Sequence, residues 1–459
     1  MSNVRPPVDS ETVDSISQLE AYFESGCRDR SDWKVGVEYE TPVVDSTDAK
    51  AVSYDGRNGI GALLACLEDS MGWQRVEEAG RIIALKNEHA SLTLEPGGQL
   101  EMSGQQCDSL HCADRELEDH VAAISAAGRE LGLRFLGLGA TPATDLAAMP
   151  WMPKERYRIM QRVMSATGSH GHRMMQQTAT VQANFDFDSE DDAQKKMRLA
   201  MALPPIVVAV SANSPLIDGR LNGYKSFRAR IWADTDPARC GILPFVFDTQ
   251  SLFGAYTRYA LDVPLYFLER DNRLVPCRGE TFRDLLEGRI NGERAFLSDW
   301  ATHLTTLFPE ARLKTYIELR SADCQPIDAM LSPPALMKGL VYENDCLEAA
   351  IDVVSDWSAD NVRDYWQAAA KDGLSARAGR HTLRDYAREL LGIAEEGLRR
   401  QSALDDTGND ETRYLGSIRE TVESGITPAD ALITNWSGIW RESFPALIDH
   451  VGVPNSKSD

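Results

Sequence analysis

The sequence lacks the short motifs that would identify its chemistry most directly. No G-x-x-x-x-G-K-[ST] run occurs, so any bound ATP is not held by a P-loop. No C-x-x-C pair occurs among the eight cysteines, which argues against a zinc ribbon or a thioredoxin-like site. Gly137 and Gly139 stand without the third glycine and the following helix of a dinucleotide-binding fingerprint. The function must therefore be inferred from how residues are patterned along the chain.

Positive charge and long apolar runs are also scarce. The net charge is −22 over 459 residues, so we expect no nucleic-acid partner, because such proteins usually carry a basic patch. The most apolar run, 201–210, is short and contains two prolines, so we expect no membrane span. Residues 1–32 are polar and offer no apolar stretch for a secretory signal. Because the cysteines are few and scattered, we expect reduced thiols and a cytoplasmic location.

The chain shows no repeat and no clear linker, which predicts one large domain. We divide it into a polar lead-in at 1–32, a core of mixed strands and helices at 33–345, and a helical C-terminal layer of the same domain at 346–459. The last residues, 455–459, are expected to fray.

Three helix starts are predicted locally. A short helix is expected at 16–23 within the lead-in. Capping boxes at Ser189-x-x-Asp192 and Thr382-x-x-Asp385 open two further helices, the second extending to Arg400.

Four predicted strands carry polar side chains on one face only. In a strand, residues i and i+2 share a face and their neighbours point the opposite way. By this rule Glu38 and Glu40 share one face of the first strand, against Val37 and Tyr39. The segments 91–103, 180–187 and 315–320 repeat this pattern, and Pro96-Gly97-Gly98 predicts a turn within the first of them. Their polar faces carry Glu95, Gln99, Glu101, Gln182, Asn184, Asp186, Tyr316, Glu318 and Arg320.

The glutamates of these faces admit two interpretations. A solvated antiparallel strand explains any one face, and taken singly it is the better interpretation. Taken together, five glutamates gather with few cations beside them, and carboxylates at that density repel one another unless protons or metal ions neutralise them. Hard oxygen donors without His or Cys favour Mg²⁺ or Mn²⁺, and Mg²⁺ commonly binds together with substrate phosphates. The pattern therefore predicts a metal site that handles phosphate.

The segment 226–232 adds the opposite charge. Interpreted as a strand, it places Arg228 and Arg230 on one face with Trp232. Paired arginines suit bidentate binding of a carboxylate or a phosphate. Surface ion pairs with Asp and Glu are the alternative, and they are the more common case for an isolated Arg-x-Arg. Because loop-forming residues flank the segment, we predict a structured loop over a site.

Several long sequence motifs resemble those of one enzyme family. They are LEPGGQLEMSG at 94–104, MPWMPKERYRIM at 149–160, FRARIWADTDP at 227–237 and YIELRSAD at 316–323. These motifs resemble those of glutamate–cysteine ligases of the plant and proteobacterial type. The resemblance implies an α+β, glutamine-synthetase-like carboxylate–amine ligase fold, in which a curved, mainly antiparallel sheet forms a funnel with helices packed outside. Residues 33–345 would then be the ligase catalytic core.

The resemblance also implies a reaction. ATP phosphorylates the glutamate side chain, and the cysteine amine attacks the resulting γ-glutamyl phosphate to give γ-glutamylcysteine, ADP and phosphate, the first step of glutathione-type thiol synthesis. The expected partners are glutamate, cysteine, ATP and Mg²⁺ or Mn²⁺, on a monomer or a homodimer. A related ligase using another amine is the nearest alternative. A phosphotransferase or a non-catalytic binding protein on the same fold are the others.

The residue roles implied by the family fall largely on positions that strand alternation had selected. The expected metal ligands are Glu38, Glu40, Glu95, Glu101, Gln182 and Glu318. Arg320 and Arg230 are expected to act in catalysis, with Arg320 on the transferred phosphate. Arg228, Asn184 and Trp232 are expected to bind substrate.

Some positions depart from the family. Gln177 stands where arginine is common, so a phosphate or glutamate contact is expected to be missing or replaced. Cys277 matches a plant redox-switch cysteine, but Gly292 stands at the place of its partner, and Asp114 replaces a second switch cysteine. We therefore expect no plant-style disulfide switch and no plastid-targeting segment.

Overall fold

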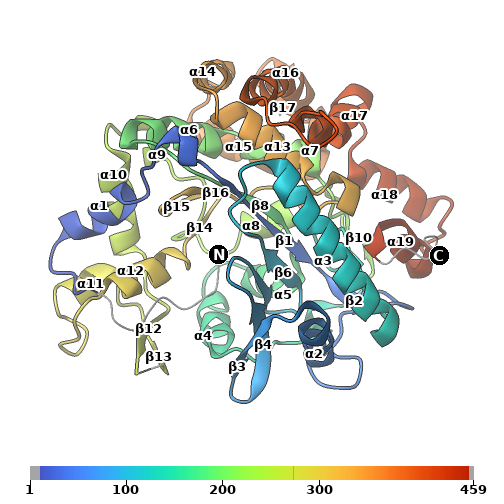
Figure 1. The fold of residues 1–459 in the computed structure, drawn as a ribbon, viewed down its shortest axis with the longest axis horizontal. Helices are drawn as coiled ribbons and strands as arrows, with labels where there is room; N and C mark the ends of the chain where they lie inside the picture. The colour runs from blue at the N-terminus through green and yellow to red at the C-terminus, as the bar shows by residue number, and fades with distance from the viewer. Residues whose placement is uncertain (1–10, 272, 454–459) are drawn as a thin grey trace.

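The fold is organised around one eight-stranded sheet (Figure 1). In the computed structural model, which describes residues 11–271 and 273–453, every neighbouring pair of strands in this sheet is antiparallel. The strands, in their order across the sheet, are β15 (Ala311–Leu313), β16 (Ile317–Leu319), β8 (Val181–Phe185), β1 (Val35–Thr41), β6 (Leu100–Ser103), β5 (Ser91–Leu94), β4 (Arg81–Lys86) and β3 (Gln74–Glu78).

The strand pairing brings the polar positions side by side. Glu38 is paired with Gln182, Glu40 with Glu101, and Glu318 with Asn184. Because side chains alternate along a strand, the neighbours of these residues lie on the opposite face, where Tyr39, for example, is 1% exposed. The predicted alternation in 34–40, 180–187 and 315–320 is therefore confirmed.

Helices cover the apolar face of the sheet, as expected. α3 (Leu110–Leu131) packs on β1 and on α2 (Ile60–Met71), while α6 (Glu190–Ala202) packs on β15 and β16. α13 (Ser332–Val341) packs on β8. Figure 1 shows α3 crossing in front of the sheet, with α6, α7 (Pro204–Ser211) and α13 above it.

The C-terminal helices extend this layer. The helices of residues 344–424 pack on α13 or on α7, and one hydrophobic core runs through residues from Val13 to Val422. The helices of residues 428–451 belong to a second, smaller core that includes Val44 and Leu136. The C-terminal helices are α14 (Asn344–Val353), α15 (Ala359–Asp372), α16 (Leu383–Gln401), α17 (Gly416–Ser424), α18 (Pro428–Ser437) and α19 (Phe444–Val451). The boundaries at 32 and 345 stay predictions, and the expected fraying at 455–459 lies outside the described residues.

Shorter elements complete the chain. The small sheets are formed by β2 (Val43–Asp45), β7 (Leu133–Leu136) and β19 (Gly452–Val453), and by the pairs β9 (Leu216–Ile217) with β10 (Arg220–Leu221), β11 (Cys240–Gly241) with β14 (Phe308–Pro309), β12 (Phe267–Arg270) with β13 (Arg273–Pro276), and β17 (Arg377–Ala378) with β18 (His381–Thr382). The remaining helices are α1 (Ile16–Glu24), α4 (Glu155–Met164), α5 (Gly171–Gln177), α8 (Phe227–Trp232), α9 (Phe245–Asp248), α10 (Leu252–Asp262), α11 (Phe282–Leu286) and α12 (Leu297–Leu304).

The predicted helix starts are confirmed. Ser189 Oγ accepts a hydrogen bond from the Asp192 amide at the start of α6. Thr382 and Asp385 form a reciprocal capping box at the start of α16. The short helix expected near 16–23 is α1, and its Phe23 is fully buried, so this part of the lead-in belongs to the folded body.

The prediction of a strand at 226–232 is wrong, because residues 227–232 form the helix α8. Ser226 Oγ accepts a hydrogen bond from the Ala229 amide, which satisfies a free donor of the first turn. In a helix the residues four positions apart share a face, so Arg228 lies beside Trp232 and Arg230 points elsewhere.

The expectation that all cysteines are reduced is also wrong. A disulfide joins Cys107, which precedes α3, to Cys112 in the first turn of α3. The other six cysteines are free, including Cys277, the residue that matches a plant switch position. Cys107 also exchanges two backbone hydrogen bonds with Val35, so the disulfide ties the start of α3 to the first residue of β1.

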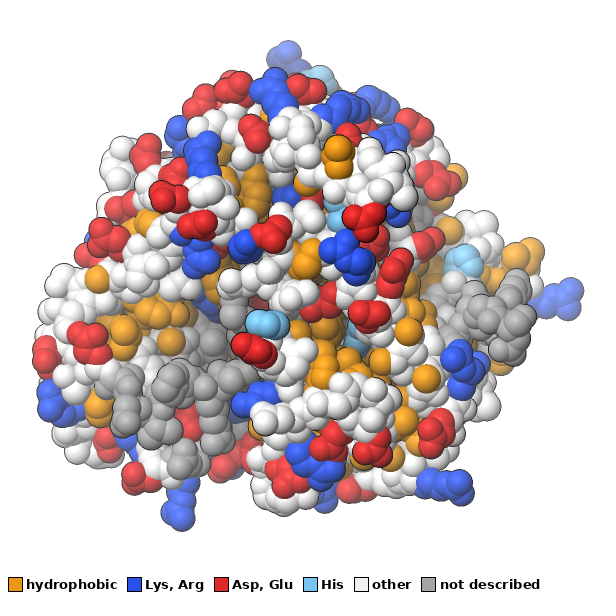
Figure 2. Space-filling view, in the orientation of Figure 1, with side chains coloured by type: hydrophobic (Ala, Val, Ile, Leu, Met, Phe, Trp, Pro, Cys, Tyr) orange, Lys and Arg blue, Asp and Glu red, His pale blue; other side chains and the backbone are white. Residues whose placement is uncertain are grey.

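Charges of both signs cover the surface. Figure 2 shows Asp and Glu side chains spread over the visible face with Lys and Arg interspersed, and no continuous basic stripe is seen there among the described residues. Within residues 11–271 and 273–453, no helix combines the length and the apolar character needed to cross a membrane.

Candidate active site

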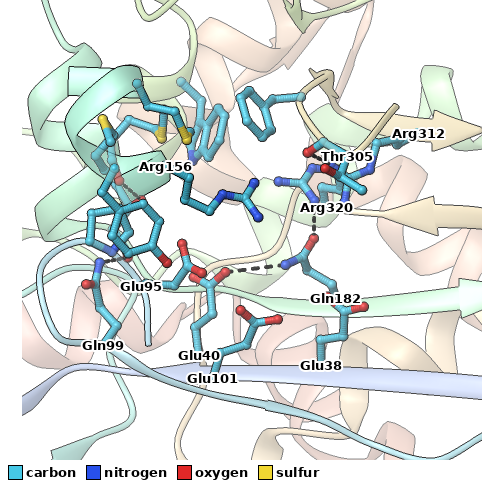
Figure 3. A pocket seen from close by; sticks show the side chains of 18 residues that line it. Glu38, Glu40, Glu95, Gln99, Glu101, Arg156, Gln182, Thr305, Arg312 and Arg320 are labelled. Atoms are coloured by element: carbon cyan, nitrogen blue, oxygen red, sulfur yellow. Dashed lines mark hydrogen bonds between the residues drawn. The ribbon is translucent and has the colours of Figure 1, made fainter. Parts of the chain in front are cut away.

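The polar face of the sheet forms the floor of a cavity of about 90 Å³. Its floor carries Glu38, Glu40, Glu95, Glu101 and Gln182 (Figure 3). Its roof and walls come from α4, α5, α8 and the segment around β14, which contribute Arg156, Tyr157, Met160, Met174, Met175, Trp232 and Phe308. A second cavity of about 540 Å³ adjoins it, and both are lined by Arg156 and Thr305.

A tight turn delivers Glu95 to this floor. The Glu95 amide donates to the Gln99 carbonyl and the Gly98 amide donates to the Glu95 carbonyl, which closes the turn between β5 and β6. A Cβ on Gly97 would lie 2.0 Å from the Gln176 carbonyl oxygen, so only glycine fits where the turn passes α5. The predicted turn at 96–98 is thereby confirmed.

The carboxylates of the floor repel one another. Burial and the charge of Glu101 raise the pKa of Glu40 to about 8, although Arg228 and Arg320 oppose the rise. Burial, Glu101 and Glu40 raise the pKa of Glu95 well above its usual value. Glu101 is held in place by hydrogen bonds from Thr93 and Ser103 hydroxyls, of 3.1 and 2.9 Å. Such a cluster is stabilised by protons or by a bound cation.

The donor chemistry of the floor fits a hard divalent cation, although its present arrangement is not a finished coordination shell. Carboxylate oxygens are the ligands that Mg²⁺ and Mn²⁺ prefer. Within the described ranges, no three His, Cys, Asp or Glu side chains are already arranged to hold a metal ion. Rotation of Glu38, Glu40, Glu95 and Glu101 within the cavity is therefore required for them to share one ion.

Two of the predicted metal ligands have their oxygens engaged by arginine. Gln182 donates to Glu40 over 3.4 Å and accepts a hydrogen bond from Arg320 (Figure 3). It thereby links the acidic floor to the arginine above it.

Glu318 differs most from the prediction of a metal ligand. It is fully buried and accepts hydrogen bonds from Arg312 at 2.6 and 2.8 Å and from Arg320 at 2.6 Å, and Lys314 lies 3.3 Å away. Although burial alone would raise its pKa, these cations hold the pKa of Glu318 well below its usual value. Because its lone pairs already have partners, Glu318 here acts as the counter-ion that orients two arginines.

Arg320 faces the carboxylate floor from the opposite wall of the cavity. Figure 3 shows the guanidinium groups of Arg320 and Arg156 above Glu40, Glu95 and Glu101. A pocket with carboxylates on one side and guanidinium groups on the other can bind a cation and an anion next to each other.

The helical course of α8 separates the residues that we predicted from it. Trp232 lines the cavity, and its Nε1 is buried without a hydrogen-bond partner. Arg228 is 3% exposed and donates to the carbonyl oxygens of Arg320 and Ser321, at 2.6 and 3.1 Å. Arg230 does not line the cavity and instead pairs with Asp234 at 3.4 Å. The predicted catalytic position of Arg230 is therefore not supported, because the helix directs it away.

Asn184 and Gln177 also lie behind the cavity wall. Asn184 donates to Glu38 Oε1 over 3.1 Å, so it orients a carboxylate and does not face the cavity. Gln177 is fully buried, donates to Asp218 and to the Thr144 carbonyl, and accepts from Arg173. The expectation that Gln177 marks a missing phosphate or glutamate contact is not supported, since this side chain points away from the cavity.

Several lining residues were missed by the sequence reasoning. Arg156, Tyr157 and Met160 lie within the motif MPWMPKERYRIM, which we interpreted only as part of a resemblance. Met160 lies four residues after Arg156 and three after Tyr157, so it neighbours both on α4, but nothing in the sequence shows that this face meets the acidic strands. Met174, Met175 and Thr178 lie at the end of α5 and gave no signal either.

Comparison with known proteins settles the family. The model of the glutamate–cysteine ligase family 2 matches residues 34–450. The chain belongs to this family. It is 38% identical to a chloroplastic glutamate–cysteine ligase of Nicotiana tabacum over 94% of this chain and 82% of that protein. It is 39% identical to glutamate–cysteine ligase B of Oryza sativa subsp. japonica over 94% of this chain and 86% of that protein.

A solved glutamate–cysteine ligase has the same fold. The crystal structure of the Francisella tularensis glutamate–cysteine ligase in complex with AMP superimposes with a TM-score of 0.53 at 14% identity, over 87% of this chain and 84% of that one. Together with the antiparallel sheet and its outer helices, this match confirms the expected α+β ligase fold.

The prediction of a cytoplasmic location is contradicted. The relatives from Nicotiana tabacum, Oryza sativa and Arabidopsis thaliana are all named chloroplastic glutamate–cysteine ligases. The scattered cysteines, on which we based the prediction, therefore did not show the location.

Proposed function

We propose that this protein joins the γ-carboxylate of glutamate to the amine of cysteine in an ATP-dependent reaction that passes through γ-glutamyl phosphate. The observation that carries the proposal is the cavity in which four glutamates face Arg156 and Arg320. The match to glutamate–cysteine ligase family 2 over residues 34–450 supports the identity of the substrates.

Four floor carboxylates are the proposed ligands of Mg²⁺ or Mn²⁺, namely Glu38, Glu40, Glu95 and Glu101. A bound divalent ion would neutralise these carboxylates and polarise the phosphates of ATP. Gln182 stays between Glu40 and Arg320, where it fixes the distance between the acidic floor and the arginine.

The larger cavity is the proposed place of the nucleotide. It has apolar walls for a base, including Val76, Ile83 and Phe267, and cationic side chains for phosphates, namely Lys86, Lys154 and Lys314. Arg156 and Thr305 line both cavities, so a triphosphate in the larger one would reach the carboxylate floor at this junction.

The arginines then act where two anions must meet. The glutamate γ-carboxylate attacks the terminal phosphorus of ATP, and the bond to ADP breaks. Arg320 and Arg156 offset the repulsion between carboxylate and phosphate and stabilise the charge that develops during the transfer. The deprotonated cysteine amine then attacks the acyl carbon, and inorganic phosphate leaves. No protein nucleophile is needed, because positioning and charge compensation drive both steps.

The test is turnover of the purified protein with Mg²⁺, ATP and glutamate, adding cysteine or one other amino acid at a time and weighing the product by mass spectrometry. We expect cysteine-dependent ADP release with γ-glutamylcysteine formed. Glu38→Gln and Arg320→Ala should abolish both, while Glu118→Gln, an exposed residue of α3, should not. Turnover with another amine alone would refute cysteine as the substrate. Whether the active form is a monomer or a homodimer stays a prediction.

A further inference from the structure

A buried carboxylate lies behind the cavity wall and takes no part in the proposed chemistry. Asp323 follows β16, is 1% exposed and lines neither of the two cavities. Its Oδ1 accepts a hydrogen bond from Ser226 Oγ at 2.7 Å, and its Oδ2 accepts from Ser214 Oγ at 2.7 Å and from the Asn213 amide at 2.8 Å. A Cβ on Gly139 would lie 2.6 Å from its Cβ and Cγ, so the chain leaves room for this side chain.

The two serine hydroxyls connect Asp323 to the first turn of helix α8. Ser214 Oγ accepts a hydrogen bond from the Arg228 amide at 3.0 Å, and Ser226 Oγ accepts from the Ala229 amide at 3.2 Å. A hydroxyl has one proton to donate and two lone pairs to accept with. Because an ionised carboxylate only accepts, both serines must turn their protons towards Asp323 and their lone pairs towards the amides of α8.

Helix α8 in turn positions two groups of the cavity. Trp232 lines the cavity directly. Arg228 donates to the carbonyl oxygens of Arg320 and Ser321, which fixes the backbone from which the Arg320 side chain extends. The guanidinium carbon of Arg320 lies 5.8 Å from the centre of the Trp232 ring. The contacts thus run without a gap from Asp323 to the arginine that faces the carboxylate floor.

We infer that Asp323 is a positioning residue of the proposed ligase reaction, which sets Trp232 and Arg320 through the hydroxyls of Ser214 and Ser226. The expected effect of Asp323 on kcat rests on the proposed function. Its expected effect on the structure of α8 rests on the hydrogen-bond geometry alone.

The decisive variant is Asp323→Asn, which keeps the size of the side chain. Its amide nitrogen donates and cannot accept, so one of the two serines loses the acceptor of its proton, its hydroxyl is free to rotate, and its hydrogen bond to an amide of α8 is weakened. Hydrogen exchange of a peptide covering 226–232 is expected to become faster, while exchange in β1 is unchanged. We expect kcat to fall about 100-fold, the loss typical of a displacement of about 1 Å in a catalytic group. The KM for ATP should stay unchanged, because Asp323 touches neither cavity.

Two variants that each remove one serine hydroxyl keep the test valid if Asp323→Asn does not fold. Ser214→Ala and Ser226→Ala each remove one hydroxyl and should each lower kcat. Combining either with Asp323→Asn should lower kcat by less than the product of the separate effects, because the residues act as one unit. Fully multiplicative effects would overturn the inference.

Glu411→Gln is the matched control. Glu411 is fully buried, accepts a hydrogen bond from the Leu110 amide at the start of α3 at 2.6 Å, pairs with Lys338, and lines neither cavity. Its variant should lower the melting temperature without lowering kcat. If Asp323→Asn behaves in the same way and leaves the exchange of 226–232 unchanged, the inference is wrong. If the wild-type protein forms no product, the proposed function fails, whereas the exchange measurement still decides the role of Asp323.

Discussion

Replacing Glu318 by glutamine is expected to destabilise the protein strongly, although the two side chains have the same shape. Glu318 is fully buried among Arg312, Lys314 and Arg320, and both of its oxygens accept hydrogen bonds from arginine. Glutamine removes the negative charge and turns an amide nitrogen towards donors. Three buried cations then face one another with no counter-ion in their midst.

The magnitude follows from the cost of breaking a buried ion pair. Removing one partner typically costs about 3–5 kcal/mol, because it leaves an uncompensated buried charge. The pKa of Glu318 is held well below its usual value, so this stabilisation is fully present above the pKa of the unfolded carboxyl, about 4.3. It is lost as the pH falls from there through the folded pKa, so the difference between wild type and variant must shrink in acid.

The assay is denaturant unfolding at pH 7 and at pH 4, with Glu118→Gln as the control. Glu118 is exposed on α3, and its variant should stay within about 0.5 kcal/mol of the wild type. A Glu318→Gln protein as stable as the wild type at pH 7 would refute the ion-pair account. A difference that grows on acidification would refute the sign of the pKa shift.

Three further predictions rest on other parts of the chain. Arg228→Ala should lower activity severely while Arg230→Ala retains it, as measured by steady-state turnover; equal losses would mean that the two arginines share a face, as in a strand. Thiol titration in denaturant without reductant should find six free thiols, and eight titratable thiols would contradict the disulfide. Because the disulfide closes a short loop, Cys107→Ser should lower the unfolding free energy by about 2 kcal/mol. Because the folded pKa of Glu40 is raised to about 8, the metal-free protein should lose stability as the pH rises from about 4.5 to 8. Mg²⁺ should therefore raise the melting temperature more at pH 8 than at pH 6. Scanning fluorimetry with chelator or Mg²⁺ checks this, and equal Mg²⁺ effects at both pH values would contradict it.

The acidic floor could be predicted from the sequence because strand alternation is a local property. Each of Glu38, Glu40 and Glu101 sits in a short strand whose apolar neighbours leave one choice of face. The turn at 96–98 joins β5 to β6 and places Glu95 near Glu101, and it was also predictable from its proline and glycines.

The arginine side could not be predicted with the same success. Over the seven residues 226–232 a period of two and a helical period are hard to distinguish. The first turn of the helix is also held from outside the segment, because the Arg228 amide donates to the hydroxyl of Ser214, which in turn donates to Asp323. The ion pairs of Glu318 likewise depend on Arg312, which belongs to the neighbouring strand. The Cys107–Cys112 bond was missed because scattered cysteines were taken as evidence of reduced thiols.

The measurement that tests the proposed chemistry most directly follows an oxygen atom. Glutamate labelled with ¹⁸O in its γ-carboxylate is incubated with the protein, Mg²⁺, ATP and cysteine, and the released phosphate is analysed by mass spectrometry. If γ-glutamyl phosphate is formed, one labelled oxygen passes into inorganic phosphate for each γ-glutamylcysteine produced. Phosphate without label, released together with the product, would contradict the acyl-phosphate route and the role given to Arg320.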